Sequence, residues 1–401
     1  MIAPFSIARL PRIEFGTGAI ARLPGLAAGF GRRLLIVTGG QSFTASPQWQ
    51  TLRRALDEAQ FAHAMVRIAG EPSPDEIDTI VRERQGHACD LVIGIGGGSV
   101  LDAAKAIAGL LRPGNTVMDH LEGVGPELPY RGPTTPFIAV PTTAGTGSEA
   151  TKNAVLTRHG PDGFKKSFRD DTLMAEYAII DPELLASCPP ALIAANGMDA
   201  CTQLLEAYCS SRANPIADAL ALAGLQAVRE GLLAWYDGGE GAAAGRERMA
   251  LAALLSGICL AQTGLGSVHG LAQPLGAFFP IAHGVVCGTL VAAATQVNIE
   301  AMQARTPDHP ALGRYARVGR LLGGDPHAKE PAAQALLLHT LREWTRRLNL
   351  PLLADLGVAE ADFARIVANA RGSSMKTNPV ALTDAEIERI LRLRLGGPGV
   401  H

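Results

Sequence analysis

Short runs of apolar residues alternate with helix-like stretches over about the first 180 residues. Residues 33–40, RLLIVTGG, form an unbroken apolar run that ends in glycines, whereas residues 74–85, PDEIDTIVRERQ, have apolar positions at helical spacing. Residues 89–111 repeat this order as a strand, a glycine loop and a helix, and further strand-like runs begin at Pro136 and Glu176. Strands without polar alternation are buried on both faces, so the pattern predicts a parallel sheet covered by helices.

Beyond these segments, strand-like runs nearly disappear and helical spacing dominates. Residues 245–266, for example, are rich in Ala and Leu at helical spacing. Near the end of the chain, Thr383 and Glu386 predict a capping box in front of the last apolar stripe. We therefore predict an α/β fold with an N-terminal parallel-sheet domain over residues 1–185 and a C-terminal all-helical domain over residues 186–401.

Composition and charge argue against several classes of protein. The chain has 401 residues, of which 47% are hydrophobic and 18% charged, and its formal net charge is −2. This balance permits a large core and argues against a nucleic-acid-binding surface. We find no uncharged apolar run long enough to span a bilayer, so we expect no membrane partner.

The cysteines and the N-terminal segment predict a cytoplasmic protein. The six cysteines form no C-x-x-C pair, and several of them lie in apolar periodic segments. Such a pattern is typical of buried free thiols in a reducing compartment. Residues 1–16 lack a charged segment followed by a sustained apolar run, so no signal peptide is expected.

The glycine loop that follows the strand-like run at residues 91–93 is a candidate phosphate-binding site. Gly96, Gly97 and Gly98 end the strand, and Ser99 opens the next helix. Glycines allow the backbone to approach a phosphate closely, and the N–H groups and dipole of the helix favour negative charge. Because Ser99 stands where the last glycine of the usual dinucleotide fingerprint would be, a plain tight turn is the alternative.

A second loop, PTTAGTGSE at residues 141–149, follows another predicted strand. Its hydroxyl side chains, which are suited to hold a ribose or pyrophosphate, are Thr142, Thr143, Thr146 and Ser148. The alternative is a turn in which these hydroxyls satisfy the loop's own backbone. Because ligands of α/β proteins bind at the carboxyl edge of the sheet, the two loops together predict a Rossmann-like dinucleotide-binding domain.

A carboxylate and an amide lie one turn apart within an apolar helix-like segment, GMDACTQLLEAY at residues 197–208. Asp199 and Gln203 therefore share one face of the predicted helix. Such a pair is unusual in a buried helix, because a charge needs a partner there. The face predicts a ligand, although Asp199 as a helix-start residue is the alternative.

Six segments of this sequence together resemble the iron-containing (group III) alcohol dehydrogenase family. They are FGTGA, GGGSVLDAAKA, PTTAGTGSEATKNAV, AIIDPEL, GMDACTQLLEAY and HGLAQPLGAFFPIAHG, in this order along nearly the whole chain. The resemblance implies a dinucleotide-binding domain, a helical metal and substrate domain, and hydride transfer between NAD or NADP and a small alcohol or aldehyde. It also implies a homodimer or a larger homo-oligomer.

The resemblance further implies four metal ligands for Fe²⁺ or Zn²⁺: an Asp, a His one turn later, and two further His. They correspond here to Asp199, His269 and His283, while Gln203 stands at the second position. A Gln carbonyl oxygen is neutral and a weaker ligand than imidazole. Three alternatives stay open: Gln203 coordinates directly or through water, the other three residues hold the metal alone, or the site binds no metal.

A second departure lies four residues after His269. The family commonly has a His at this position, which is proposed to pass the alcohol proton toward solvent. This chain has Gln273, which does not titrate near neutral pH. The catalytic proton relay is therefore unassigned, with water and the cofactor ribose as one route.

The resemblance assigns cofactor binding to glycines, hydroxyl side chains, a carboxylate and a lysine. These residues are Gly39, Gly96, Gly97, Gly98, Ser99, Asp102, Thr142, Thr143, Thr146, Ser148 and Lys165. Lys166 is an alternative to Lys165 at the ribose, and Asn153 is a candidate substrate contact. Many NAD-preferring members have an Asp where this chain has Gly39, so the missing carboxylate leaves room for a 2′-phosphate and favours NADP.

Three other functions compete with a metal-assisted alcohol dehydrogenase or aldehyde reductase. Gln203 would suit a metal-free reductase of the maleylacetate-reductase type, although the intact Asp199, His269 and His283 argue against it. A lyase resembling dehydroquinate synthase shares the architecture but fits the long loop motifs less well. The third alternative is a nucleotide-binding module without turnover.

Overall fold

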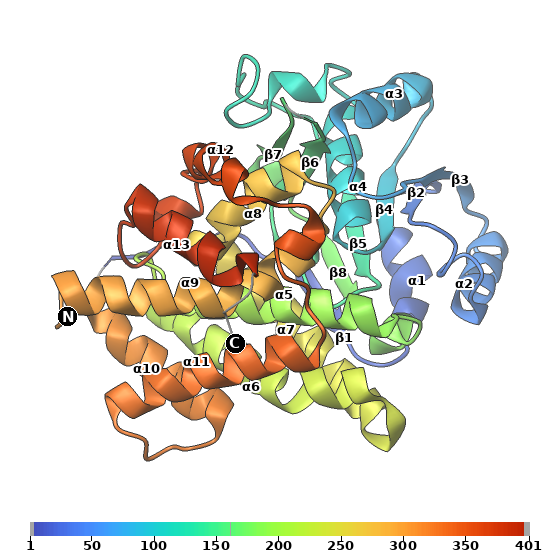
Figure 1. Ribbon diagram of the computed structural model, residues 1–401. Coiled ribbons are helices and arrows are strands. Elements are labelled where there is room, and N and C mark those ends of the chain that lie inside the picture. The colour runs from blue at the N-terminus through green and yellow to red at the C-terminus, as the bar shows by residue number, and fades with distance from the viewer. Residues whose placement is uncertain (1–3, 161, 397–401) are drawn as a thin grey trace. The chain divides into compact units, whose positions relative to one another are not determined.

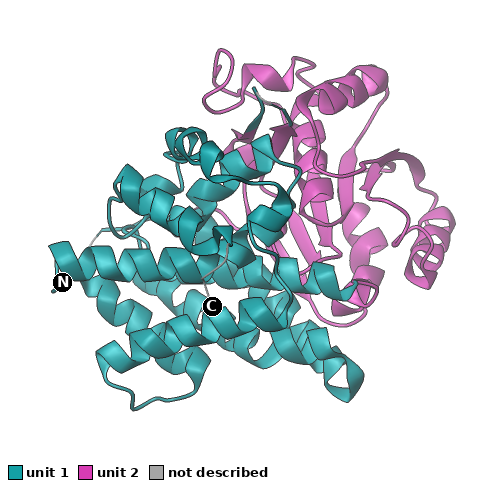
Figure 2. Ribbon diagram, viewed as in Figure 1, with its two compact units in different colours: residues 1–7, 159–164, 189–401 teal, residues 8–158, 165–188 magenta. Residues whose placement is uncertain are grey.

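The computed structural model describes residues 4–160 and 162–396, which form two compact units (Figures 1 and 2). The α/β unit comprises Ala8–Arg158 and Lys165–Cys188. The helical unit comprises Met1–Ile7, His159–Phe164 and Pro189–His401. The parallel sheet and the mostly helical C-terminal region confirm the predicted fold class, while the division into domains at residue 185 stays a prediction.

A six-stranded sheet forms the centre of the α/β unit. Its strand order is β1-β8-β5-β4-β2-β3, and every pair of neighbours is parallel. The strands are β1 (Arg12–Phe15), β2 (Arg33–Thr38), β3 (Ala62–Arg67), β4 (Leu91–Gly96), β5 (Phe137–Pro141) and β8 (Tyr177–Ile180). Every residue of β4 and β5 is buried, as expected of central strands covered on both faces.

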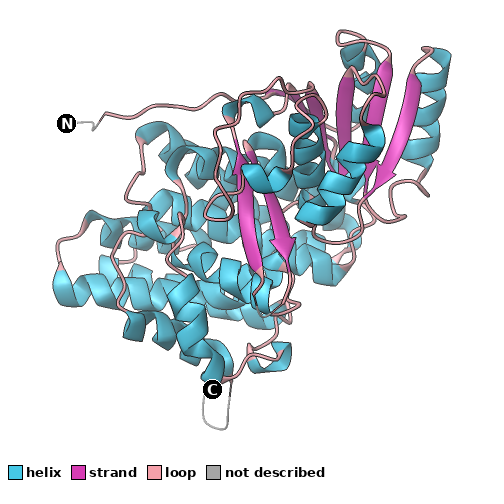
Figure 3. Ribbon diagram, turned by 90° about the horizontal axis from the view of Figure 1, so that it is seen from above, coloured by secondary structure: helices cyan, strands magenta, loops and turns pink. Residues whose placement is uncertain are grey.

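Four helices accompany this sheet: α1 (Leu23–Ala27), α2 (Pro47–Glu58), α3 (Pro74–Arg84) and α4 (Gly98–Leu110). A separate pair of strands, β6 (Asn153–Arg158) and β7 (Phe164–Arg169), stands apart from the main sheet (Figure 3). Helix α4 contacts β4 and β5 and also β6. This double cover explains why α4 is mostly apolar, with every residue from Val100 to Leu110 except Asp102 buried.

The helical unit has no strand within residues 190–396. Its helices are α5 (Pro190–Cys209), α6 (Pro215–Asp237), α7 (Ala242–Thr263), α8 (Ser267–Phe278), α9 (His283–Arg305), α10 (Pro310–Gly323), α11 (Glu330–Arg347), α12 (Phe363–Asn369) and α13 (Asp384–Leu395). Helix α5 packs against α6, α7 and α9, and α8 also packs against α9. The predicted capping box of Thr383 and Glu386 is present at the start of α13.

Helix α9 is long and apolar enough to cross a membrane by length and composition alone. Within its most apolar window, however, 83% of the residues are buried inside the protein, as is typical of a core helix. A second apolar stretch, which combines Gly239–Thr263 with Ser267–Phe278, is bent by 102° at its break.

Candidate metal centre and cofactor-binding edge

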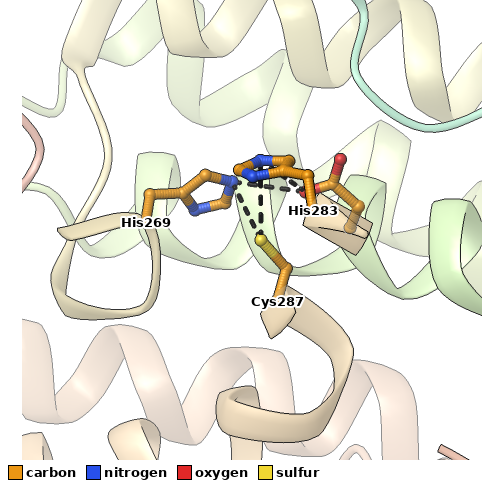
Figure 4. Close-up of side chains that lie close together, drawn as sticks. His269, His283 and Cys287 are labelled. Atoms are coloured by element: carbon orange, nitrogen blue, oxygen red, sulfur yellow. Dashed lines mark hydrogen bonds and ion pairs between the residues drawn. The ribbon is translucent and has the colours of Figure 1, made fainter. Parts of the chain in front are cut away.

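Four side chains of the helical unit bring their ligand atoms within 4.8 Å of one another: Asp199, His269, His283 and Cys287. Asp199 lies on α5, His269 in the first turn of α8, and His283 and Cys287 at the start of α9. Figure 4 shows the two imidazoles and the thiol pointing toward one another. Three of the four candidate ligands, Asp199, His269 and His283, are therefore adjacent and a thiol joins them, while metal binding by Gln203 stays a prediction.

The distances within this cluster are short. His269 Nε2 lies 3.3 Å from Asp199 Oδ1, and His283 Nε2 lies 3.8 Å from the same oxygen. The Sγ atom of Cys287 lies 3.6 Å from His269 Nε2 and 3.7 Å from His283 Nε2. One atom from each residue thus faces a common centre.

Local sequence explains how α9 reaches α5 so closely. His283 is the first residue of α9, and Gly284 follows it. A Cβ atom at Gly284 would lie only 2.6 Å from the backbone oxygen of Ala195 on α5, so only glycine permits this approach. Cys287 lies one turn after His283, and helical spacing places both side chains on one face.

The charge states in this cluster are those of a pocket that favours a cation. Burial raises the pKa of Asp199, but His283, His269 and Cys287 outweigh burial and lower it to about 2. For His269, burial lowers the pKa, yet Cys287, Glu206 and Asp199 raise it well above the ordinary value. The carboxylate is ionised and positive charge beside it is stabilised.

The surroundings of one oxygen of the buried Asp199 carboxylate show whether a metal fits this cluster. Asp199 is 1% exposed, and its Oδ2 accepts no hydrogen bond from the described residues. An ionised oxygen buried in this way costs free energy unless a cation or a donor meets it. Carboxylate, imidazole and thiolate are also the usual ligand types of zinc and iron sites, so the residues present fit a divalent metal.

Glu206 orients one of the imidazoles and was not predicted from the sequence. Its Oε2 lies 2.6 Å from His269 Nδ1, and its Oε1 accepts a 2.7 Å hydrogen bond from the backbone N–H of Val268. Nδ1 therefore donates to Glu206, and Nε2 faces Asp199 and Cys287. Metal-binding histidines ordinarily donate their second N–H in this way. The available signal was spacing, because Glu206 follows Asp199 by seven residues on the same helical face.

Gln203 and Gln273 stand where the family pattern has histidines, and each lies on the same helix as the candidate ligand before it. Gln203 is 2% exposed and lies one turn after Asp199 on α5. Gln273 is partly exposed on α8, one turn after His269, and a Cβ atom at Gly372 would lie 2.7 Å from its Oε1. Neither amide exchanges a proton at neutral pH.

In the α/β unit, the two predicted loops lie against each other at the carboxyl edge of the sheet. Strands β4 and β5 are neighbours, and Thr142 N–H donates a 2.9 Å hydrogen bond to the oxygen of Gly96. A Cβ atom at Gly98 would lie 2.7 Å from Thr146 Oγ1. A Cβ atom at Gly97 would lie 3.2 Å from Thr143 Oγ1 in the same loop. Glycine is therefore required for this contact between the loops.

Helix α4 presents an open N-terminus at this edge. Gly97 is its N-cap residue, and no side chain of the described residues caps it. Ser99, in the first turn, is partly exposed. Uncapped N–H groups at the start of a long helix bind phosphate readily, which is the role predicted for this loop.

Sheet topology points to the same place. From β2 the chain passes outward to β3 and then returns to β4 on the other side of β2, so the topological switch point lies between β2 and β4. Ligands of open α/β sheets bind outside the strand ends at such a point. Gly39 follows β2, and a Cβ atom there would lie 3.3 Å from Val100 in the first turn of α4. Position 39 therefore lies beside the glycine loop.

A buried polar network fixes the second loop onto α4. Asp102 accepts a 2.5 Å hydrogen bond from Ser148 Oγ and lies 3.3 Å from Lys105 Nζ. Lys105 is fully buried and also donates to Thr151 Oγ1 at 3.0 Å and to the backbone oxygen of Asn153 at 2.6 Å. Asp102 and Ser148 thus contact each other directly, which orients the loop beside the glycines.

Lys165, the predicted ribose contact, is buried on β7 and bound by a carboxylate. Its Nζ lies 2.5 Å from Glu71 Oε1, and Thr157 Oγ1 donates a 2.6 Å hydrogen bond to Glu71 Oε2. Lys166, the alternative, is more exposed. The predicted roles of Lys165 and of Asn153, which is partly exposed at the start of β6, stay predictions.

Both halves of the chain match one protein family. Residues 11–182 match the family described as iron-containing alcohol dehydrogenase, and residues 193–395 match the C-terminal domain of the Fe-containing alcohol dehydrogenase family. The chain is 32% identical over 397 residues to alcohol dehydrogenase 4 of Schizosaccharomyces pombe, a match that covers 97% of this chain and 89% of that protein.

A further relative and a solved structure are likewise named as a dehydrogenase and an oxidoreductase. An NAD-dependent methanol dehydrogenase of Bacillus methanolicus is 31% identical over 334 residues, across 82% of this chain and 84% of the relative. The crystal structure of a 1,3-propanediol oxidoreductase matches with a TM-score of 0.85 at 26% identity, across 98% of this chain and 100% of that one. The chain thus belongs to the iron-containing alcohol dehydrogenase family and is an oxidoreductase, and hydride transfer between NAD(P) and a small alcohol or aldehyde with the assistance of a metal is consistent with this family.

Proposed function

We propose that the metal of this enzyme is held by Asp199, His269 and His283, and that NADPH is its preferred cofactor. The observation that carries the metal assignment is the buried cluster itself, in which an ionised carboxylate and two imidazoles share one centre. When bound, the metal supplies a Lewis acid for the substrate oxygen and the nicotinamide supplies or accepts the hydride.

The protein's own residues have distinct tasks in this proposal. Asp199 provides negative charge, and Glu206 keeps the Nε2 atom of His269 directed at the centre through the 2.6 Å contact with Nδ1. At the sheet edge, the N-terminus of α4 binds the pyrophosphate of the cofactor. Because Gln273 does not titrate, the proton of the alcohol leaves through water or the cofactor and not through this side chain.

The preference for NADPH rests on position 39. Gly39 places no carboxylate at the switch point, where a carboxylate would bind the ribose hydroxyls of NAD and repel a 2′-phosphate. The relative from Bacillus methanolicus is named as NAD-dependent. We therefore base the proposed preference for NADPH on Gly39 of this chain and not on that relative.

Steady-state kinetics with both cofactors test the proposal. Metal content is measured first, and oxidation of NADPH and NADH is then followed with a panel of small aldehydes. We expect a higher kcat/KM with NADPH and a shift toward NADH by about tenfold in Gly39→Asp, with Gly40→Asp as the matched control. A kcat/KM that is about tenfold higher with NADH than with NADPH would overturn the cofactor assignment.

A metal-free reductase is the second candidate, because Gln203 replaces an imidazole ligand. Removal of the metal with a chelator distinguishes the metal-assisted enzyme from the metal-free reductase. Loss of turnover after dialysis against a chelator, with recovery on addition of Zn²⁺ or Fe²⁺, supports the metal-assisted enzyme. Turnover that survives complete removal of the metal supports the alternative.

We also propose a homodimer or larger homo-oligomer in the cytoplasm. The six cysteines are all free thiols, which suits a reducing compartment. Light scattering on the purified protein measures the assembly, and a mass of one chain, 41.9 kDa, would contradict it. Cell fractionation measures the location.

A further inference from the structure

We propose that Cys287 is the fourth ligand of the metal and that, together with Asp199, His269 and His283, it forms a thiolate-containing site that prefers zinc to iron. The inference rests on the proposed metal-assisted function. It concerns a residue that neither the sequence motifs nor the family pattern assigns to the metal.

The separations between ligand atoms match those around a tetrahedral zinc ion. With ordinary Zn–N, Zn–O and Zn–S bond lengths, a tetrahedral site places N and O atoms about 3.4 Å apart and N and S atoms about 3.6 Å apart. In this structure, Cys287 Sγ lies 3.6 Å and 3.7 Å from the two imidazole Nε2 atoms. The Asp199 oxygen lies 3.3 Å and 3.8 Å from the same two atoms. Four of the separations are thus close to those of a tetrahedral zinc site, and all four ligand atoms lie within 4.8 Å of one another.

Cys287 has the surroundings of a ligand and not of an ordinary buried thiol. It is fully buried, it is a free thiol, and its Sγ faces His269 and His283 (Figure 4). Cys259 is also buried, but its Sγ contacts the backbone oxygen of Ala217 at 3.5 Å. Cys201 on α5 is also buried, but it does not belong to the cluster of possible ligand atoms.

A thiolate ligand at Cys287 also compensates for the weaker donor at position 203. The family pattern has an imidazole at position 203, and an amide oxygen is a poor replacement for it. Cys287 restores a strong fourth donor from a different helix. Coordination replaces the S–H bond with an S–metal bond and releases one proton to solvent.

Charge and softness together select the metal. A thiolate and the carboxylate of Asp199 balance the two positive charges of the ion within a buried site. Thiolates are soft ligands that favour zinc over harder ions, and Zn²⁺ also binds nitrogen and sulfur sites more tightly than Fe²⁺ does. We therefore expect zinc to outcompete iron at this centre.

Cobalt substitution tests the inference directly, because Co²⁺ bound to a thiolate has a sulfur-to-metal charge-transfer band in the near ultraviolet. The full-length protein is stripped of metal, loaded with one equivalent of Co²⁺ and compared with Cys287→Ala and with the matched control Cys201→Ala. We expect the band in the wild type and in the control, and its loss in Cys287→Ala while the visible bands of bound Co²⁺ persist.

Zinc affinity provides the second measurement. Competition with a chromophoric chelator is expected to show zinc affinity at least about tenfold weaker in Cys287→Ala than in Cys201→Ala. Circular dichroism of the metal-free proteins confirms that each variant is folded. A folded Cys287→Ala with unchanged zinc affinity would contradict the inference.

The outcomes distinguish this inference from the proposed function. Stoichiometric Co²⁺ without a charge-transfer band in the wild type overturns the role of Cys287 but leaves the metal site of Asp199, His269 and His283 intact. A wild type that binds neither Co²⁺ nor Zn²⁺ overturns both. Iron bound more tightly than zinc in the wild type overturns the preference for zinc.

Discussion

Replacing Glu206 with glutamine tests whether this carboxylate sets the tautomer of a metal ligand. Both Glu206 oxygens accept in the structure, at 2.6 Å from His269 Nδ1 and at 2.7 Å from the N–H of Val268. A glutamine side chain has one acceptor and one donor. In either orientation of the amide, a donor therefore meets a site that needs an acceptor.

The two orientations of the introduced amide have different costs. With the amide oxygen toward Val268, the amide N–H₂ faces Nδ1, so His269 must carry its proton on Nε2, the atom that would bind the metal. With the opposite orientation, the N–H of Val268 loses its acceptor, which costs about 1–3 kcal/mol for a buried donor. Substitutions that break such an outer contact typically weaken metal binding by about 10- to 100-fold, or about 1.4–2.7 kcal/mol.

Zinc affinity of Glu206→Gln is measured by chelator competition, next to the control Glu230→Gln. Glu230 is an exposed carboxylate on α6 that contacts Arg248, so its substitution removes a charge at the surface and leaves the ligand atoms untouched. Stability of the metal-free proteins is measured by urea unfolding, which separates folding from binding. Metal affinity of Glu206→Gln within about twofold of the wild type would refute the tautomer argument.

Two further predictions concern the α/β unit. In Gly98→Ala, a Cβ atom 2.7 Å from Thr146 forces the two loops apart, so the Kd for NADPH, measured by fluorescence titration, rises by about tenfold or more, whereas it stays unchanged in Gly40→Ala, where a Cβ atom meets no atom within 4 Å. Burial raises the pKa of Glu149 from 4.5 to about 7, so the folded state holds a proton that the unfolded chain has already released. The free energy of unfolding therefore falls as pH rises from about 4.5 to about 7, and Glu149→Gln gains on the order of 3 kcal/mol relative to the wild type by pH 8. A variant that loses stability relative to the wild type over this window would show that Glu149 is stabilised as an anion.

Much of the α/β unit follows from the sequence. The unbroken apolar run of β4 and the glycines after it predicted a buried strand, a tight loop and a helix, and the structure has all three. The short edge strand β1 was not predicted, since RIEF is only four residues long and half of it is exposed. The pair β6 and β7 was missed because charged residues interrupt its apolar positions, as in FKKSFR.

Some residues of the site can be predicted from sequence motifs, whereas others are brought together only by the packing of helices. Asp199, His269 and His283 were assigned from long motifs, and the structure places them side by side. Cys287 was interpreted as an ordinary buried thiol, although its spacing of four residues from His283 places both on one face of a helix. Its position beside His269 depends on the packing of α8 against α9, which no local spacing encodes. Glu206 was detectable by spacing alone, but its partner on α8 was not.

The placement of the imidazoles explains why this centre needs so much negative charge. His269 and His283 lie in the first turns of α8 and α9, where the helix dipole creates a positive potential. That potential opposes a bound cation, so Asp199 and Glu206, joined by a thiolate at Cys287, are required to reverse it. Glu206 also accepts the N–H of Val268 and so removes part of the opposing potential of α8. With a substrate oxygen bound at the centre, the same helix ends would stabilise negative charge on that oxygen.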